Sequence, residues 1–211
     1  MAQTLINNAL YVNGAITVVG AISSTVGMAR STLTEDSLAT YTVPLTNMRV
    51  HDAVATLLPT AAANDDMGLV SGTFATDIPS LQGVDFGGTA TDEKCRFFFA
   101  LPIEYVTAGT ATLRCSAGIL TTLADASLTL DCEAYISDRE GDVVVGDLYA
   151  GAALDINSLT LGDKDFSLTA TNLNAGDLLD IRLSFAGSDA GDLGTMAAII
   201  AQVEMLLDVK G

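Results

Sequence analysis

Apolar and polar residues alternate with a period of two in four separate segments of the chain. The segments are RFFFALPIEY (residues 96–105), ATLRCSAGI (111–119), SLTLDCEAYI (127–136) and LDIRLSF (179–185). Alternation of this kind is typical of β-strands that bury one face and expose the other. The predicted core positions include Phe97, Phe99, Leu101 and Ile103, then Leu113, then Leu128 and Leu130, and finally Leu179, Ile181, Leu183 and Phe185.

Other parts of the chain carry weaker strand patterns. Residues 41–58 are rich in β-branched side chains but are interrupted by Pro44 and Asn47, which predicts two short strands or one bent strand. Residues 67–75 predict a further strand, and the Gly/Asp-rich residues 77–94 predict a long loop. Residues 29–39 are polar and predict a connector, in which Ser31 or Thr34 is placed to cap a short helical turn.

The last segment, residues 194–211, is compatible with two structures. Its Ala and Met residues favour a helix, whereas its apolar residues also recur at strand spacing. The strands that precede it favour a final strand. In that strand the inward positions would be Ile199, Ala201, Val203, Met205 and Leu207.

Short segments with turn chemistry separate the predicted strands: VTAGT, LADAS, SDREGD, LGDKD, NLNAGD and AGSDAGD. The strands recur about every twelve to eighteen residues, which suits a Greek-key or jelly-roll sandwich. The prediction is therefore an all-β fold, an antiparallel β-sandwich with an extended N-terminal β-arm. The arm comprises residues 1–30 and the sandwich residues 31–211.

The arm contains fourteen consecutive residues without a charge, LYVNGAITVVGAIS (residues 10–23). An Asn-Gly pair between β-formers predicts a hairpin, but both of its faces are apolar, and an isolated hairpin is marginal in water. We expect it to lie against its own domain or a neighbouring subunit, and the neighbour is favoured. The residues predicted to make this oligomer or capsid contact are Leu10, Tyr11, Val12, Asn13, Gly14, Ile16, Val18, Val19 and Ile22.

The charge of the N-terminal segment argues against two other interpretations of it. No Lys or Arg precedes Arg30, so the basic start of a secretory signal is missing. Gly14 and Gly20 interrupt the apolar run, which is also too short for a membrane-spanning helix. We therefore predict no membrane partner.

The whole chain is acidic, with 9 Lys and Arg against 26 Asp and Glu and a formal charge of −17. Such a field repels phosphate backbones, so nucleic acid is not a predicted partner. Three cysteines, Cys95, Cys115 and Cys132, are an odd number without a CxxC motif, and we expect buried, reduced thiols.

Motifs that carry chemistry are scarce. A single histidine, His51, excludes multi-histidine zinc sites, and we expect it to be a hydrogen-bonded strand or loop residue. The sequence has no GxSxG elbow, no phosphate-binding GxxxxGK[ST] loop and no GxGxxG opening a helix. We therefore predict no enzyme activity, no catalytic residue and no cofactor.

Acidic pairs and tyrosines are the remaining candidates for binding. Asp65-Asp66 and the acidic stretches 138–142 and 189–192 offer oxygen ligands to a cation such as calcium, but none fits the EF-hand spacing. We interpret them as solvated turns and predict no metal site. Tyr135 and Tyr149 are the candidate sugar platforms, although packing on a strand face is the favoured role of both.

Two long segments resemble structural proteins of tailed phages. They are SLATYTVPLTNMRVHDAVATLLPTAAANDDMGLVSGTF and SLTLGDKDFSLTATNLNAGDLLDIRLSFAGSDAGDLGTMAAIIAQVEMLLDVKG. In the second, an "AGD-apolar-apolar-D-apolar-R" strand (residues 175–182) is followed by an acidic loop and a last strand. The opening VNGAITVVGAIS is similar to the N-terminal arms of trimeric phage fibres and cement proteins.

This resemblance implies a homotrimeric β-sandwich on the outer capsid surface of a phage particle, made in the host cytoplasm. Its expected role is that of a cement, or decoration, protein that binds the major capsid protein and stabilises the head by bridging capsomers. The alternative is a tail-associated or fibre-like module that binds a glycan or receptor.

Overall fold

The computed structural model of the chain describes residues 36–84, 91–120, 126–137, 146–189 and 197–210. The predicted arm, residues 1–30, and the acidic stretch 138–142 lie outside the described residues. Ten strands and one short 3-10 turn are present in the described part: β1 (Asp36–Thr42), η2 (Leu45–Asn47), β2 (Gly68–Val70), β3 (Ser80–Val84), β4 (Thr91–Ala100), β5 (Ala111–Ile119), β6 (Ala126–Ser137), β7 (Leu154–Asp155), β8 (Gly162–Ser167), β9 (Leu178–Asp189) and β10 (Ala197–Lys210).

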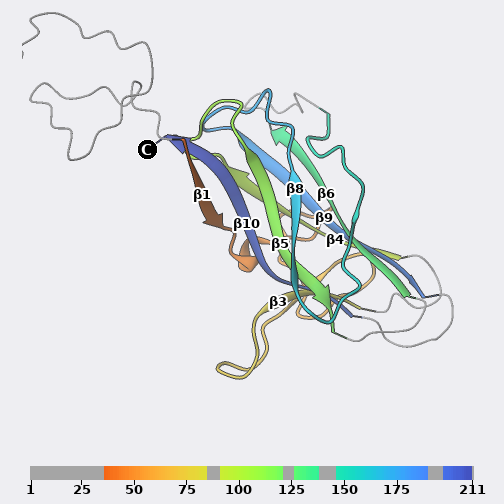
Figure 1. Cartoon of the computed structure of the whole chain (residues 1–211). Helices are drawn as coiled ribbons and strands as arrows, with labels where there is room; N and C mark the ends of the chain where they lie inside the picture. The colour runs from red at the N-terminus through yellow and green to blue at the C-terminus, as the bar shows by residue number, and fades with distance from the viewer. Residues whose placement is uncertain (1–35, 85–90, 121–125, 138–145, 190–196, 211) are drawn as a thin grey trace, which may run out of the picture. The chain divides into compact units, whose positions relative to one another are not determined.

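The strands form two antiparallel sheets, as Figure 1 shows, and the molecule is the β-sandwich that the alternating segments predict. Sheet A has the order β2-β3-β10-β5-β8. Strands β3 and β1 share one edge of β10, with β3 paired to its first half and β1 to its second half. Sheet B has the order β4-β9-β6-β7. Strands neighbouring in space are thus mostly distant in sequence, which is typical of a sandwich.

The core lies between the two sheets and is built from the inward positions of β4, β5, β6, β9 and β10. Phe97, Leu113 and Phe185 are fully buried in it. The other predicted core residues that the structure buries are Leu101, Leu128, Leu130, Leu179, Ile181 and Leu183. Phe99 is partly buried and packs edge-on against Tyr41 of β1, with ring centroids 6.3 Å apart.

Ile103 is an exception, because the structure leaves 76% of its surface exposed. Strand β4 ends at Ala100, before Pro102, and the alternation does not continue past that point. Proline lacks the N–H that a ladder needs, so the strand stops where the sequence pattern alone would extend it.

The final segment forms a strand, as predicted, but its inward residues differ from the predicted set. The register of β10 against β5 shifts between Ile200 and Gln202, which is a β-bulge. An extra residue in a strand moves the side chains before it to the opposite face of the sheet from the one that the simple alternation predicts. Ala198 and Ile200 are therefore buried ahead of the bulge, whereas Ile199 and Ala201 are only partly buried.

Several weaker predictions were wrong in their bounds. Residues 36–39 belong to β1 and not to a connector, and residues 43–58 hold only the turn η2 and isolated bridges in place of the predicted strands. The strand predicted over residues 67–75 is limited to Gly68–Val70. The predicted loop over residues 77–94 contains β3 and the start of β4, and the segment LGDKD lies largely in β8. Within the described ranges, no helix has the length and apolar character needed to cross a membrane.

Candidate functional site

The outer face of sheet B carries a row of charged side chains across three adjacent strands. Arg96 of β4 lies directly opposite Arg182 of β9, and Arg182 lies opposite Glu133 of β6. Two residues along the same strands, and so on the same face, Asp180 of β9 lies opposite Tyr135 of β6. These residues occupy the polar positions of the alternating pattern, which point away from the core.

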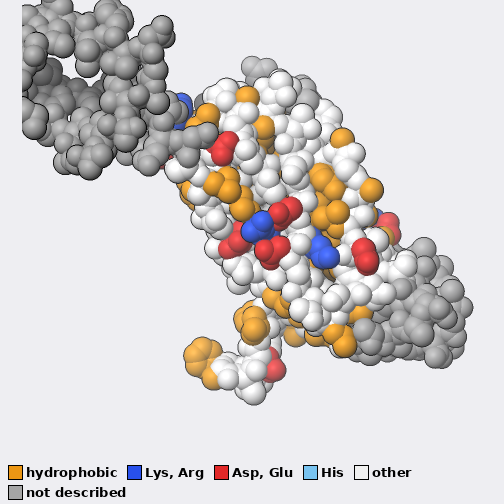
Figure 2. All heavy atoms as spheres, in the orientation of Figure 1, with side chains coloured by type: hydrophobic (Ala, Val, Ile, Leu, Met, Phe, Trp, Pro, Cys, Tyr) orange, Lys and Arg blue, Asp and Glu red, His pale blue; other side chains and the backbone are white. Residues whose placement is uncertain are grey.

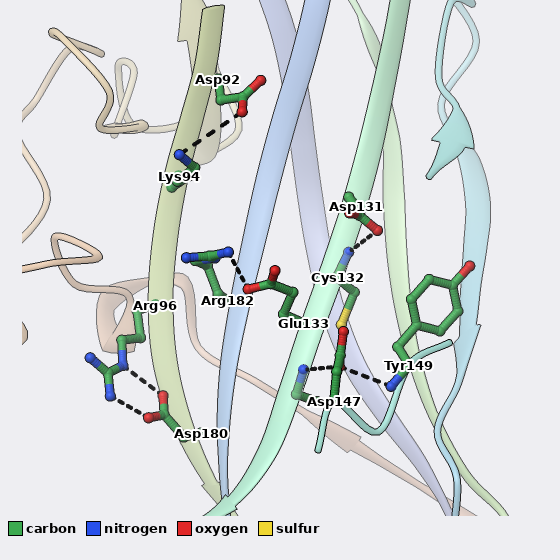
Figure 3. A network of polar contacts seen from close by, with 11 residues as sticks. Asp92, Lys94, Arg96, Asp131, Cys132, Glu133, Asp147, Tyr149, Asp180 and Arg182 are labelled. Carbon is green, nitrogen blue, oxygen red and sulfur yellow. Dashed lines mark hydrogen bonds and ion pairs between the residues drawn. The ribbon is translucent and has the colours of Figure 1, made fainter. Parts of the chain in front are cut away.

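Each arginine in this row pairs with its own carboxylate (Figure 3). The Nε of Arg96 donates to Asp180 at 2.7 Å, and its Nη2 donates to the other oxygen of the same carboxylate, so the pair is bidentate. The hydrogen bond to Asp180 raises the pKa of Arg96. Arg182 forms an ion pair with Glu133 through its Nη2. The Nε of Arg182 is buried and has no hydrogen-bond partner among the described residues.

A loop segment is held against the free edge of β4 beside this row. Arg49 and Arg96 exchange backbone hydrogen bonds of 2.8 and 3.0 Å, and the N–H of Lys94 donates to the carbonyl of Asp65 at 2.8 Å. These contacts cover the edge strand and bring His51 to the sheet. His51 is thus a loop residue that contacts carboxylates, with Nδ1 3.5 Å from Asp66 and Nε2 3.6 Å from Asp65.

Strands β4, β6 and β9 and the loop that carries His51 border an open hollow of about 230 Å³. Burial raises the pKa of Tyr135, and the nearby Glu133 adds to that effect. At one end of the row the Arg96 guanidinium lies 5.5 Å from the centre of the Phe98 ring, which is 40% exposed. The hollow is lined by His51, Arg96, Glu133, Tyr135, Asp180 and Arg182.

The outer face of sheet A has a different arrangement of charge. Arg114 of β5 forms a bidentate pair with Asp165 of β8, with both distances 2.7 Å, and a weaker contact of 3.5 Å with Asp163. The hydrogen bonds from Arg114 lower the pKa of Asp165. The depression beside Arg114 has a volume of only about 20 Å³, which is much smaller than the hollow on sheet B.

The segment between β2 and β3, residues 71–79, is the second notable surface feature. It projects from the sandwich in Figure 1, and Figure 2 shows hydrophobic side chains at its outer end. Phe74 is 98% exposed and Ile78 is 74% exposed. Single exposed apolar residues are common, so it is the presence of two large ones on one projecting segment that makes it a candidate contact site. We call residues 71–79 the projecting loop.

Internal hydrogen bonds fix the conformation of the projecting loop. The carbonyl of Thr73 accepts from the N–H groups of Thr76 and Asp77 at 3.0 and 2.9 Å. The side chain of Asp77 accepts from the N–H of Thr73 at 2.9 Å. Ala75 has a φ of +68°, which is unusual for a residue with a Cβ. Phe74 is therefore presented by a closed turn.

Most of the other residues singled out from the sequence lie away from these surfaces, and Tyr135 is the exception. The three cysteines are free and buried in the core, as predicted. Burial raises the pKa of Cys95 to about 12 and raises the pKa values of Cys115 and Cys132 as well. Tyr149 packs edge-on against Phe166, with centroids 5.1 Å apart, in the role favoured for it, whereas Tyr135 lines the hollow.

One group of residues has the composition of a cation site. Ligand atoms of His51, Asp52 and Asp66 lie within 4.8 Å of one another. The sequence singled out Asp66 as an acidic pair with Asp65, but not its proximity to His51. Exposed carboxylates beside a histidine are common in loops, and nothing else about the group distinguishes it from a solvated turn.

Sequence reasoning missed both Arg96 and Arg182 as site residues. Each occupies an ordinary polar position of an alternating strand, and only the pairing of β4 with β9 brings them together. The exposed Phe74 was assigned to the end of a predicted strand, whereas the structure places it in the projecting loop.

Comparisons with known proteins concern the fold only. The sequence matches no protein-family model and no curated protein. Among solved structures, the chain is similar to the CBM22-1 xylan-binding domain of Paenibacillus barcinonensis Xyn10C, with 14% identity and a TM-score of 0.37 over 69% of this chain and 82% of that one. It is also similar to the VP2 subviral particle of infectious bursal disease virus, with 16% identity and a TM-score of 0.30 over 73% of this chain and 42% of that one.

Proposed function

We propose that the protein is a structural component of a tailed-phage particle that binds the outer capsid surface and stabilises the head by bridging capsomers. The observation that carries the proposal is the projecting loop, with Phe74 98% exposed on a closed turn. A rigid loop that presents an aromatic side chain loses little conformational entropy on docking, and aromatic residues dominate the energetics of protein interfaces. Its expected partner is an apolar pocket of the major capsid protein.

Two features of the sequence support the same proposal. One of the segments that resemble tailed-phage structural proteins, residues 37–74, includes the first half of the projecting loop and ends at Phe74. The charge of −17 favours the outside of a particle, because packaged DNA would repel it. In this proposal the uncharged residues 10–23 contact a neighbouring copy within a homotrimer.

The test is a co-sedimentation assay with capsids purified without this protein. Full burial of a Phe side chain contributes about 1.5–3 kcal/mol. Phe74→Ser should therefore weaken capsid binding about 10- to 150-fold. Leu159→Ser is the matched control, because Leu159 is also apolar and 58% exposed but lies outside the projecting loop. The proposal is wrong if both variants bind capsids as tightly as the parent protein.

The alternative is a tail-associated glycan- or receptor-binding module that uses the sandwich loops, with Asp138 and Tyr149 among its candidate residues. Asp138 lies outside the described residues, and the ring of Tyr149 packs against Phe166. Virions analysed by cryo-microscopy distinguish the two locations. Density for the sandwich on capsomers supports the capsid role, and density confined to the tail supports the alternative.

A further inference from the structure

We propose that the hollow on the outer face of sheet B is a binding site for a neutral saccharide. This site is separate from the projecting loop and does not depend on the capsid role. The evidence is an open space of about 230 Å³ lined by paired charges and by Tyr135, and the Nε of Arg182, a buried donor without a partner among the described residues on a side chain that lines this space.

The first argument concerns the hydrogen-bonding groups that the hollow offers. A guanidinium has five N–H donors, and the ion pair with Glu133 uses the Nη2 of Arg182. The buried Nε of Arg182 has no partner among the described residues. A buried donor without a partner is costly, so a ligand oxygen that reaches this atom would be bound favourably.

The second argument concerns charge, which excludes two classes of ligand. An anion is disfavoured because Asp180 and Glu133 already neutralise the two arginines, and the whole chain is strongly acidic. A cation is disfavoured because the same two carboxylates are held by guanidinium groups. A neutral ligand whose groups both donate and accept hydrogen bonds fits the paired charges, and a hydroxyl does both.

The third argument concerns shape and apolar contact. Tyr135 lines the hollow, and the exposed ring of Phe98 lies beside Arg96, whose side chain also lines it. Aromatic rings can pack against the apolar C–H faces of a sugar ring while charged groups bind its hydroxyls. The volume is below the range of about 300–1,000 Å³ that encloses drug-sized ligands. The hollow therefore suits one or two sugar units of a longer chain that continues along the open sheet.

The experiment uses the full chain on an array of neutral oligosaccharides, including hexaoses of glucose, xylose, mannose and galactose, with sulfated and phosphorylated glycans alongside. We expect at least one neutral oligosaccharide to bind. Its affinity, measured by calorimetry, should fall at least tenfold in Arg182→Gln and should stay within twofold in Arg114→Gln. Arg114 is the matched control, because it is ion-paired on the opposite sheet.

Three outcomes would overturn the proposal: no binding to any neutral oligosaccharide, binding only to the anionic glycans, or an equal loss in Arg182→Gln and Arg114→Gln. Tyr135→Phe is the second variant, since it removes one hydroxyl and leaves the ion pairs intact. It should also weaken binding if Arg182→Gln fails to fold. Capsid co-sedimentation should be unchanged in both hollow variants, so that failure of this site and failure of the capsid role are separately visible.

Discussion

Arg96 and Arg182 lie directly opposite each other on neighbouring strands, and each is paired with a different carboxylate. Two like charges facing each other across a sheet are destabilising unless they are compensated. The carboxylates of Asp180 and Glu133 thus make the row of positive charge compatible with the fold. The same pairing shapes the hollow, so stability and the proposed binding site depend on one set of contacts.

Asp180→Asn should lower the free energy of unfolding by about 1–3 kcal/mol, because it leaves Arg96 without its charged partner and beside Arg182. Urea denaturation at neutral pH measures the change, and added salt should reduce it by screening the two arginines. Asp165→Asn is the control on sheet A. The side chain of Asp165 is 43% exposed and that of Asp180 19%, and Asp163 remains near Arg114, so the control should lose less than about 1 kcal/mol. Equal losses would contradict this prediction.

Gly68→Ala should destabilise the sandwich by about 1–3 kcal/mol through overpacking. A Cβ at residue 68 would lie 2.3 Å from the backbone N of Ala62 and 2.4 Å from the carbonyl carbon of Ala61, so the backbone of that loop would have to move. Gly162→Ala is the matched control in β8, where a Cβ meets nothing within 4 Å. Thermal denaturation compares the two, and the same melting temperature in both variants would refute the close-approach argument.

The stability of the protein should fall as pH rises above about 9. Burial raises the pKa of Cys95 from 9.0 to about 12, so between these values the unfolded chain releases a proton that the folded chain retains. Each such proton lowers the free energy of unfolding by about 1.4 kcal/mol per pH unit. Cys115 and Cys132 shift in the same direction.

Urea denaturation at pH 8, 9 and 10 measures this slope, and Cys95→Ala supplies the comparison. The variant should be less stable overall but should lose stability less steeply above pH 9, because one ionising thiol is missing from its unfolded state. Parallel slopes in the two proteins would show that the thiol of Cys95 does not govern the alkaline transition.

Removing residues 1–30 should abolish trimer formation or capsid binding while the sandwich stays folded, because the uncharged hairpin segment is the predicted contact with a neighbouring copy. Light scattering gives the oligomeric state, and co-sedimentation gives capsid binding. Ile16→Asp with Val18→Asp tests the same contact without shortening the chain. A truncated protein that still trimerises and still binds capsids would disprove the assignment of the arm.

The sequence predicted the strands that bury one complete face. β5, β6 and β9 alternate cleanly because their inward residues, such as Leu113, Leu130 and Ile181, are all buried against the other sheet. The sequence of β8, GDKDFS, indicates a turn because Phe166 is its only fully buried residue. Asp163 and Asp165 point outward and pair with Arg114. Edge strands of this kind carry little periodic signal.

The candidate site could not be predicted, for a different physical reason. Arg96, Glu133 and Arg182 come from three strands, and their proximity depends on strand order and register, which local patterns do not encode. The bulge in β10 could not be predicted for the same reason. The extra residue, Ala201, changes the face on which Ile199 lies, and only the pairing of β10 with β5 reveals it. Local chemistry predicts elements, whereas pairing between distant segments determines the site.

The position of β10 has a consequence for how the protein is made. This strand follows every other described strand in the chain, yet it lies in the middle of sheet A and pairs with β1, β3 and β5. Sheet A therefore cannot close while residues 197–210 are still inside the ribosome, and the earlier strands must wait with their apolar faces uncovered. A messenger broken before residue 197 would yield chains that lack the central strand of sheet A and cannot complete that sheet.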